Sequence, residues 1–139
     1  MAASEANKAF SEAVYLASFM EYYDNWRVVA LKRFFLQPIK RNQYFIIRDK
    51  GEPVAFFSYA FVGDNAVEEL ASGKRSIGHD EWNTGDNLFI PDIVSPFGLK
   101  ASWVKHVRDK LGERHGDKIK ARWLRSLKGR SGYAYTRLN

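Results

Sequence analysis

One carboxylate stands out as a residue that could do chemistry, because it lies inside an otherwise apolar stretch. Asp92 follows the apolar run Leu88-Phe89-Ile90 and precedes the stop Pro96-Phe97-Gly98. Burial disfavours the charged form of a carboxyl group, so Asp92 either receives hydrogen bonds from waiting donors or performs chemistry. Backbone N–H groups at a strand irregularity are one such set of donors. Both interpretations make Asp92 the first residue to locate.

A second candidate is the aromatic pair Tyr22-Tyr23, which falls at the junction of two expected helices and not on a helix face. Aromatic side chains at such positions usually belong to a hydrophobic core. The alternative is that a phenol hydroxyl takes part in the chemistry of a site.

Other common kinds of site are not indicated by the sequence. The three histidines, His79, His106 and His115, show no metal-ligand spacing, and the chain has no cysteine, which excludes disulfides, thiolate nucleophiles and Cys-based zinc sites. Glycine-rich phosphate loops and the G-x-S-x-G nucleophile motif are also missing. We therefore expect no metal and no tightly bound cofactor.

The elements that must position these residues follow from hydrophobic spacing and from turn residues. The spacing predicts helices that end at Tyr22, at Pro38 and at Gly112, with a β-hairpin between the second and third. The expected order is helix 4–22, helix 26–38, strand 43–48, turn 49–52, strand 53–61, short helix 67–70, strand 89–94, helix 99–111, strand 119–123, turn 128–132 and strand 133–138.

This order predicts an α+β fold with a mixed, mostly antiparallel sheet flanked by helices. The length of 139 residues suits one domain, 1–139, with a basic C-terminal hairpin at 119–139. The chain shows no apolar run near the roughly 18 residues of a membrane span, and its N-terminus lacks the pattern of a signal peptide. A cytoplasmic protein is expected.

Basic charge is concentrated at the C-terminal end of the chain. Residues 100–139 hold 12 Lys and Arg against 3 Asp and Glu, whereas residues 1–99 hold 10 against 13. Lys118, Lys120 and Arg122 would form the outer face of a half-buried strand. Such a face either docks an acidic partner, such as an anionic protein, a membrane surface or nucleic acid, or simply keeps the protein soluble. The signal for nucleic acid is weak.

Four motifs resemble those of the RTX toxin-activating lysine acyltransferases, which are similar in fold to Gcn5-type N-acyltransferases, and the resemblance covers about residues 13–111. The matching motifs are Asn25-Trp26, Asn42-Gln43-Tyr44, Pro53-Val54-Ala55-Phe56 with Ser58-Tyr59-Ala60, and Trp82 with Gly85-Asp86 and Asp92 to Pro96-Phe97-Gly98. The resemblance implies transfer of a fatty acyl group from acyl carrier protein, or from acyl-CoA, to a lysine of a target protein.

The resemblance also implies roles for particular residues. The catalytic aspartate of the family falls on Asp92, and its catalytic histidine falls on Tyr23. The resemblance places substrate-binding roles on Asn25, Trp26, Ser58, Phe97 and Gly98. For an acyltransferase of this kind, the basic face of Lys118, Lys120 and Arg122 would dock the acidic carrier protein or another anion.

Tyr23 is a departure that matters chemically. An imidazole accepts a proton near neutral pH, whereas a tyrosine of pKa about 10 is a poor base. Tyr23 would then act as an acid or a positioning group, or Asp92 would work through water, or catalysis would be lost.

Two functions follow. The first is a protein-lysine acyltransferase. The second is a non-catalytic homologue that acts as a binding or structural protein, for example in a homo-oligomer or in phage virion assembly, and that is located in the host cytoplasm or in the virion.

Overall fold

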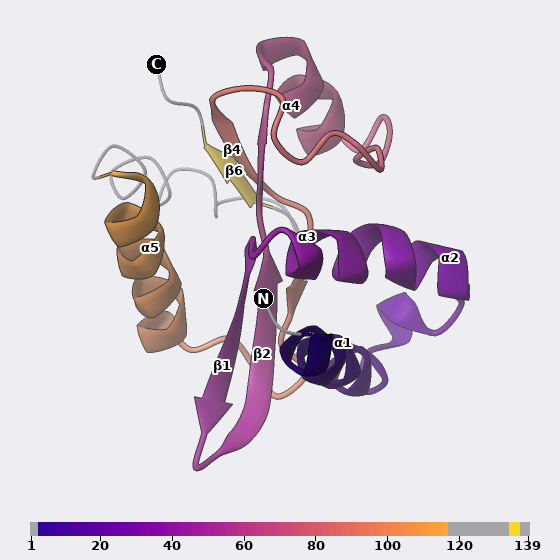
Figure 1. The fold of residues 1–139 in the computed structure, drawn as a ribbon, viewed down its shortest axis with the longest axis vertical. Coiled ribbons are helices and arrows are strands. Elements are labelled where there is room, and N and C mark those ends of the chain that lie inside the picture. Colours follow the sequence, from indigo (N-terminus) through magenta and orange to yellow (C-terminus); the bar gives the residue numbers. More distant parts are fainter. Residues whose placement is uncertain (1–2, 117–133, 137–139) are drawn as a thin grey trace. The chain divides into compact units, whose positions relative to one another are not determined.

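The computed structural model describes residues 3–116 and 134–136, and the chain divides into two compact units. The first unit comprises residues 1–58 and 92–99, and the second comprises residues 59–91 and 100–139. Both units combine helices with antiparallel strands (Figure 1), so the predicted α+β class is confirmed. One domain over residues 1–139 and the likeness to Gcn5-type acyltransferases stay predictions.

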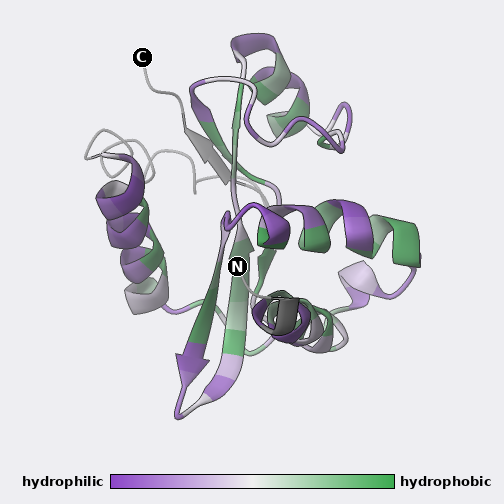
Figure 2. Cartoon of the chain, viewed as in Figure 1, coloured by the Kyte–Doolittle hydropathy of each residue, from purple (hydrophilic) through white to green (hydrophobic). Residues whose placement is uncertain are grey.

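The sheet of the first unit is built on the predicted hairpin. Strands β1 (Tyr44–Asp49) and β2 (Glu52–Ser58) pair antiparallel, and β5 (Ile93–Val94) pairs with the other edge of β2. At the turn, Lys50 and Gly51 have φ values of 51° and 83°, which is typical of the tight turn that matches the twist of a hairpin. Figure 2 shows both strands becoming hydrophilic toward this turn.

The first helix is shorter than its pattern predicts. Helix α1 spans Ala3–Ala17, and the chain then turns before the 3-10 helix η1 (Glu21–Tyr23). The Ser18 hydroxyl donates to the carbonyl of Tyr15, and Met20 has extended backbone angles of −120° and 123°. A serine that bonds to its own helix backbone competes with the helical ladder, which accounts for the early end.

The prediction that Pro38 ends the second helix is wrong. Helix α2 (Val28–Leu31) continues through a π-helical turn, η2 (Lys32–Leu36), into α3 (Gln37–Lys40), which contains Pro38. The π-turn has already interrupted the regular pattern of helical hydrogen bonds just before Pro38. The missing N–H of the proline therefore costs the helix little stability.

Helices and sheet of the first unit share one hydrophobic core. Helix α1 contacts β2, β5 and the η2–α3 segment. The fully or almost fully buried residues of this core are Ala9, Ala13, Leu16, Ala17, Tyr23, Phe35, Ile39, Phe56 and Val94.

The second unit has its own three-stranded antiparallel sheet in the order β3-β4-β6. Its strands are β3 (Ala60–Val62), β4 (Asn87–Ile90) and β6 (Ala134–Thr136), and its helices are α4 (Asp64–Ala71) and α5 (Ala101–His115). Strand β6 and helix α4 confirm elements expected at 133–138 and 67–70. The predicted strand 119–123 and turn 128–132 lie outside the described residues.

Two predicted strands each divide into two. The expected strand 53–61 breaks at Tyr59 into β2 and β3, and the expected strand 89–94 breaks at Pro91 and Asp92 into β4 and β5. In each case the two parts belong to different sheets. Proline lacks the N–H that a continuing ladder needs, which explains the second break.

The predicted helix stop at Gly112 is also wrong. Helix α5 continues to His115, and Gly116 ends it with a φ of 104°. Gly112 is buried inside the last turns, whereas Gly116 takes the positive φ that glycine adopts most readily.

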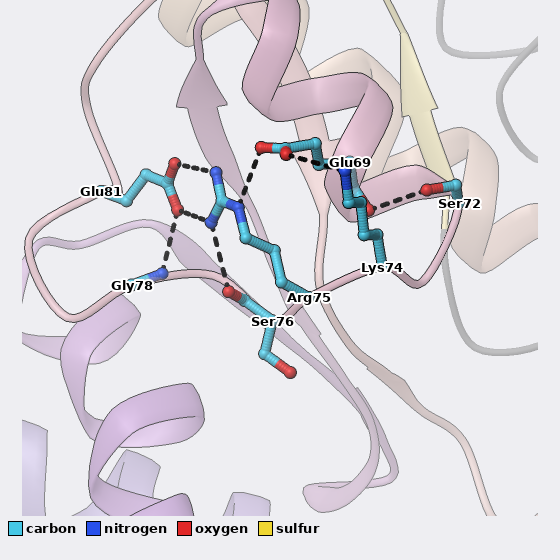
Figure 3. Close-up of polar contacts among 7 residues, drawn as sticks. All are labelled: Glu69, Ser72, Lys74, Arg75, Ser76, Gly78 and Glu81. Atoms are coloured by element: carbon cyan, nitrogen blue, oxygen red, sulfur yellow. Dashed lines mark hydrogen bonds and ion pairs between the residues drawn. The ribbon is translucent and has the colours of Figure 1, made fainter.

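An arginine holds the loop between α4 and β4 in place. The Arg75 guanidinium binds both carboxylate oxygens of Glu81 at 2.7 Å and one oxygen of Glu69 at 3.1 Å (Figure 3). The Gly78 N–H donates to Glu81 at 3.0 Å. These charge-assisted bonds raise the pKa of Arg75 and fix the loop that leads to Trp82.

Among residues 3–116 and 134–136, no helix is long and apolar enough to span a membrane.

Gly85, which lies in one of the family motifs, is a position where the backbone of the second unit packs closely. A Cβ atom added there would lie 2.4 Å from backbone atoms of Val62 and Gly63. We expect Gly85→Ala to lower the free energy of unfolding by about 1–3 kcal/mol, because the backbone must shift to accept the methyl group. Urea unfolding followed by circular dichroism measures the change.

Gly78→Ala is the matched control, since its added Cβ would meet only Glu81 side-chain atoms at 3.6 Å. Equal effects of the two substitutions would contradict the close packing at Gly85.

Candidate functional site

The structure brings the two candidate residues of the sequence together in the first unit. The Tyr23 hydroxyl donates a hydrogen bond of 3.0 Å to Oδ1 of Asp92. Asp92 is 4% exposed and Tyr23 is 8% exposed, so the bond is almost completely shielded from water. These residues are 69 positions apart in the chain, and only the folding of η1 against the segment before β5 makes them neighbours.

The backbone of Asp92 is held by Ser58 at the end of β2. The Ser58 N–H donates to the Asp92 carbonyl at 3.1 Å, and the Asp92 N–H donates to the Ser58 hydroxyl at 3.2 Å. In a regular antiparallel ladder a backbone carbonyl would accept the Asp92 N–H, whereas here the Ser58 hydroxyl oxygen accepts it. Ser58 is fully buried. We therefore interpret it as a residue that positions Asp92, although the resemblance predicts a substrate-binding role for it.

Aromatic rings surround the phenol of Tyr23. Trp26 meets its ring edge-to-face at a centroid distance of 4.7 Å, Tyr22 at 4.8 Å, and Phe35 packs at 5.7 Å. Such contacts stabilise aromatic pairs beyond simple burial and restrict the rotation of the ring. The hydroxyl of Tyr23 is thereby held in the direction of Asp92.

Phe35 is a component of the site that sequence reasoning missed. It lies in the π-turn η2 and is fully buried between Tyr23, Trp26 and the β2 residue Phe56. Phe35 falls within the helix expected over 26–38, but nothing in its spacing marked it as part of a site. The π-turn that sets its direction leaves no recognisable sequence signal.

The electrostatics of Asp92 depend mainly on burial. Burial raises the pKa of its carboxyl group to about 7, and the hydrogen bond from Tyr23 opposes that rise only in part. Near neutral pH the carboxyl group therefore exists in both protonation states. A carboxylate of this kind can accept a proton that an ordinary surface aspartate, with a pKa about 3 units lower, would not hold.

The remaining predicted site residues are distributed differently. Asn25 is exposed just after η1, and Trp26 is half-buried against Tyr23. Phe97 is 56% exposed and packs on Phe19, and Gly98 has a φ of 99° in the turn closed by Ser95. Their substrate-binding roles stay predictions. Lys118, Lys120 and Arg122 lie outside the described residues.

The described residues do not indicate a metal site. Across the described ranges, 3–116 and 134–136, there is no cluster of three or more His, Cys, Asp or Glu side chains that would hold an ion. His115 instead lies 3.1 Å from the hydroxyl of Tyr59, and His79 pairs with Asp80.

Comparison with known proteins identifies the family. The model of the RTX toxin acyltransferase family matches residues 2–133, so the chain belongs to this family. An RTX-II toxin-activating lysine-acyltransferase of Actinobacillus pleuropneumoniae is 31% identical over 87 residues, which are 63% of this chain and 54% of that protein. The resemblance seen in the motifs is thereby confirmed.

Two further relatives show the same pattern. A protein-lysine palmitoyltransferase of Bordetella bronchiseptica is 34% identical over 108 residues, covering 78% of this chain and 55% of its own length. A lysine-acyltransferase of Vibrio cholerae is 34% identical over 77 residues, covering 55% and 50%. The chain thus spans about half the length of the curated relatives it matches.

Burial of Asp92 predicts a pH-dependent stability. Its pKa is about 7 in the folded state and about 3.9 in an unfolded chain, so the folded state binds more protons between these values and loses stability as pH rises from about 4 to about 7. Asp92→Asn keeps an oxygen acceptor for Tyr23 and removes the ionisation. Relative to this variant, we expect the wild type to lose up to about 4 kcal/mol over that range.

Urea unfolding of both proteins from pH 4 to 8 measures this difference, with Asp24→Asn at an exposed position as the matched control. Parallel stability curves for wild type and Asp92→Asn would contradict a raised pKa at Asp92.

Proposed function

We propose that this chain is a protein-lysine acyltransferase, which transfers an acyl group from acyl carrier protein, or from acyl-CoA, to a lysine of a target protein. Membership in the family and the acyltransferase activities for which the relatives are named support the reaction class. The observation that carries the proposal is the buried hydrogen bond between Tyr23 and Asp92, the two residues on which the resemblance places the family's catalytic pair.

The two side chains divide the work of proton transfer. A lysine must lose its proton before its nitrogen attacks the thioester, since its pKa is ordinarily about 10.4. Ionised Asp92 is the acceptor of that proton. Tyr23 is the more exposed member of the pair, and its oxygen can accept a proton from the amine while its own proton passes to Asp92. The tyrosine then works without ever becoming a free phenolate.

The amine nitrogen forms a C–N bond with the thioester carbonyl carbon, and the C–S bond of the donor breaks. The lysine ammonium group loses two protons in all, the first through Tyr23 to Asp92 before the attack and the second from the nitrogen as the amide forms. The departing thiolate takes one of these protons and water takes the other, which returns Asp92 to its ionised form. The overall products are an amide on the target lysine, a free thiol on the donor and one proton released to water.

Transfer of a labelled acyl chain from acyl carrier protein to protein lysines tests the proposal. We expect Asp92→Asn and Tyr23→Phe each to lower the rate by a factor of about 10² or more, the usual contribution of general acid–base catalysis. Tyr23→His places the family's imidazole at this position, and we expect it to raise the rate at neutral pH.

Tyr22→Phe is the matched control for Tyr23→Phe, because Tyr22 is adjacent and 56% exposed. Label transfer no greater with the wild type than with Asp92→Asn would reject the enzyme and favour the non-catalytic homologue, a binding or virion-assembly protein, instead.

The rate of transfer should also depend on pH. Because Asp92 must be ionised to accept a proton, and its pKa is about 7, we expect the single-turnover rate to rise through pH 7 and then level off. A rate that is flat between pH 6 and 8 would show that Asp92 does not act as the base.

A further inference from the structure

A shallow pocket lies on helix α5 of the second unit. Its volume is about 320 Å³, and it is lined by Ala101, Val104, Lys105 and Arg108. These positions follow the i, i+3, i+4, i+7 spacing that places residues on one face of a helix. Ala101 and Val104 supply an apolar floor, and the two cations stand beside it. We call this surface the α5 groove.

Positive charge is concentrated around the α5 groove. Residues 100–108 contain Lys100, Lys105 and Arg108 and no carboxylate. The Lys105 side chain is 67% exposed, whereas that of Arg108 is 21% exposed. Asp109, the residue after Arg108, forms ion pairs with both Lys105 at 3.0 Å and Arg108 at 3.7 Å, so one carboxylate partly neutralises two cations.

The helix macrodipole does not account for these cations. Basic residues near the first turns of a helix oppose its macrodipole, and the first turn of α5 contains no acidic residue. The charges of the second half are more balanced, since Lys110 pairs with Glu113 at 3.6 Å. Local contacts use part of this charge, since Lys105 pairs with Asp109 and Lys100 lies over the Trp103 ring, but the Lys105 side chain stays 67% exposed and can reach a partner.

We propose that the α5 groove docks an acidic amphipathic helix of the protein that carries the acyl donor, an inference that rests on the proposed function. An apolar side chain of the partner helix would occupy the floor at Ala101 and Val104, and its carboxylates would face the surrounding cations. Such helix-in-groove docking combines an apolar anchor with charge complementarity. A nucleic-acid backbone would use the cations but leave the apolar floor without a role.

Binding of the full 139-residue chain to a bacterial holo acyl carrier protein without an acyl chain tests the proposal. Calorimetric titration of wild type, Lys105→Glu and Lys110→Glu compares two lysines on one helix. Each substitution makes the same change of charge, and each removes one ion pair. We expect Lys105→Glu to weaken binding about three- to tenfold at low salt, and Lys110→Glu to leave it nearly unchanged.

The apolar floor needs its own variant. Ala101→Leu fills the pocket and should weaken binding, whereas Ser102→Leu adds the same side chain at the neighbouring exposed position and should not. Circular dichroism of all four variants establishes that each is folded. Equal effects of the Lys105 and Lys110 substitutions, or no binding of the carrier by wild type, would overturn the proposal, as would preference for a single-stranded oligonucleotide.

The binding experiment tests docking independently of the proposed acyl transfer, because the holo carrier protein holds no acyl group to transfer. Carrier binding that depends on Lys105 but is not followed by label transfer would reject the reaction and leave the docking surface. Label transfer that is indifferent to Lys105 and Ala101 would reject the docking surface and leave the reaction.

Discussion

The buried hydrogen bond between Tyr23 and Asp92 is the interaction on which the rest of the first unit depends. A carboxyl group removed from water costs several kcal/mol if it stays ionised without partners, so its environment must either neutralise it or hold donors for it. The fold does both in part. Burial raises the pKa to about 7, and one phenol donor stabilises the ionised form. The result is a group whose protonation changes near neutrality.

Several departures from regular structure serve this interaction. Strands β4 and β5 belong to different sheets, and Asp92 lies in the short segment between them. There its backbone N–H bonds to Ser58 and its side chain faces Tyr23. The π-turn of η2 places the ring of Phe35 against Tyr23 and Trp26. Irregular backbone of this kind gathers at functional sites because regular ladders cannot direct side chains so freely.

A phenol in place of the histidine that the resemblance predicts at position 23 would change the chemistry open to this member of the RTX toxin acyltransferase family. An imidazole carries a proton by itself near neutrality, whereas a phenol can do so only as a relay to a stronger base. Burial gives Asp92 the proton affinity that such a base needs. Under the proposed function, the acid–base role falls more on the carboxyl group than on the aromatic residue, and the hydrogen bond holds the two side chains together.

Local patterns in the sequence determined the hairpin, the helical segments, the α+β class and the family, because alternation, helical spacing and motif order are properties of neighbouring residues. Asp92 and Tyr23 were each recognisable, the first as a carboxylate among apolar residues and the second as the residue on which the resemblance places the family's histidine. Their hydrogen bond, the support from Phe35 and the division of the 89–94 segment between two sheets were decided only by the tertiary structure. These features depend on contacts between segments far apart in the chain, and burial, which sets the pKa of Asp92, exists only once those segments have packed.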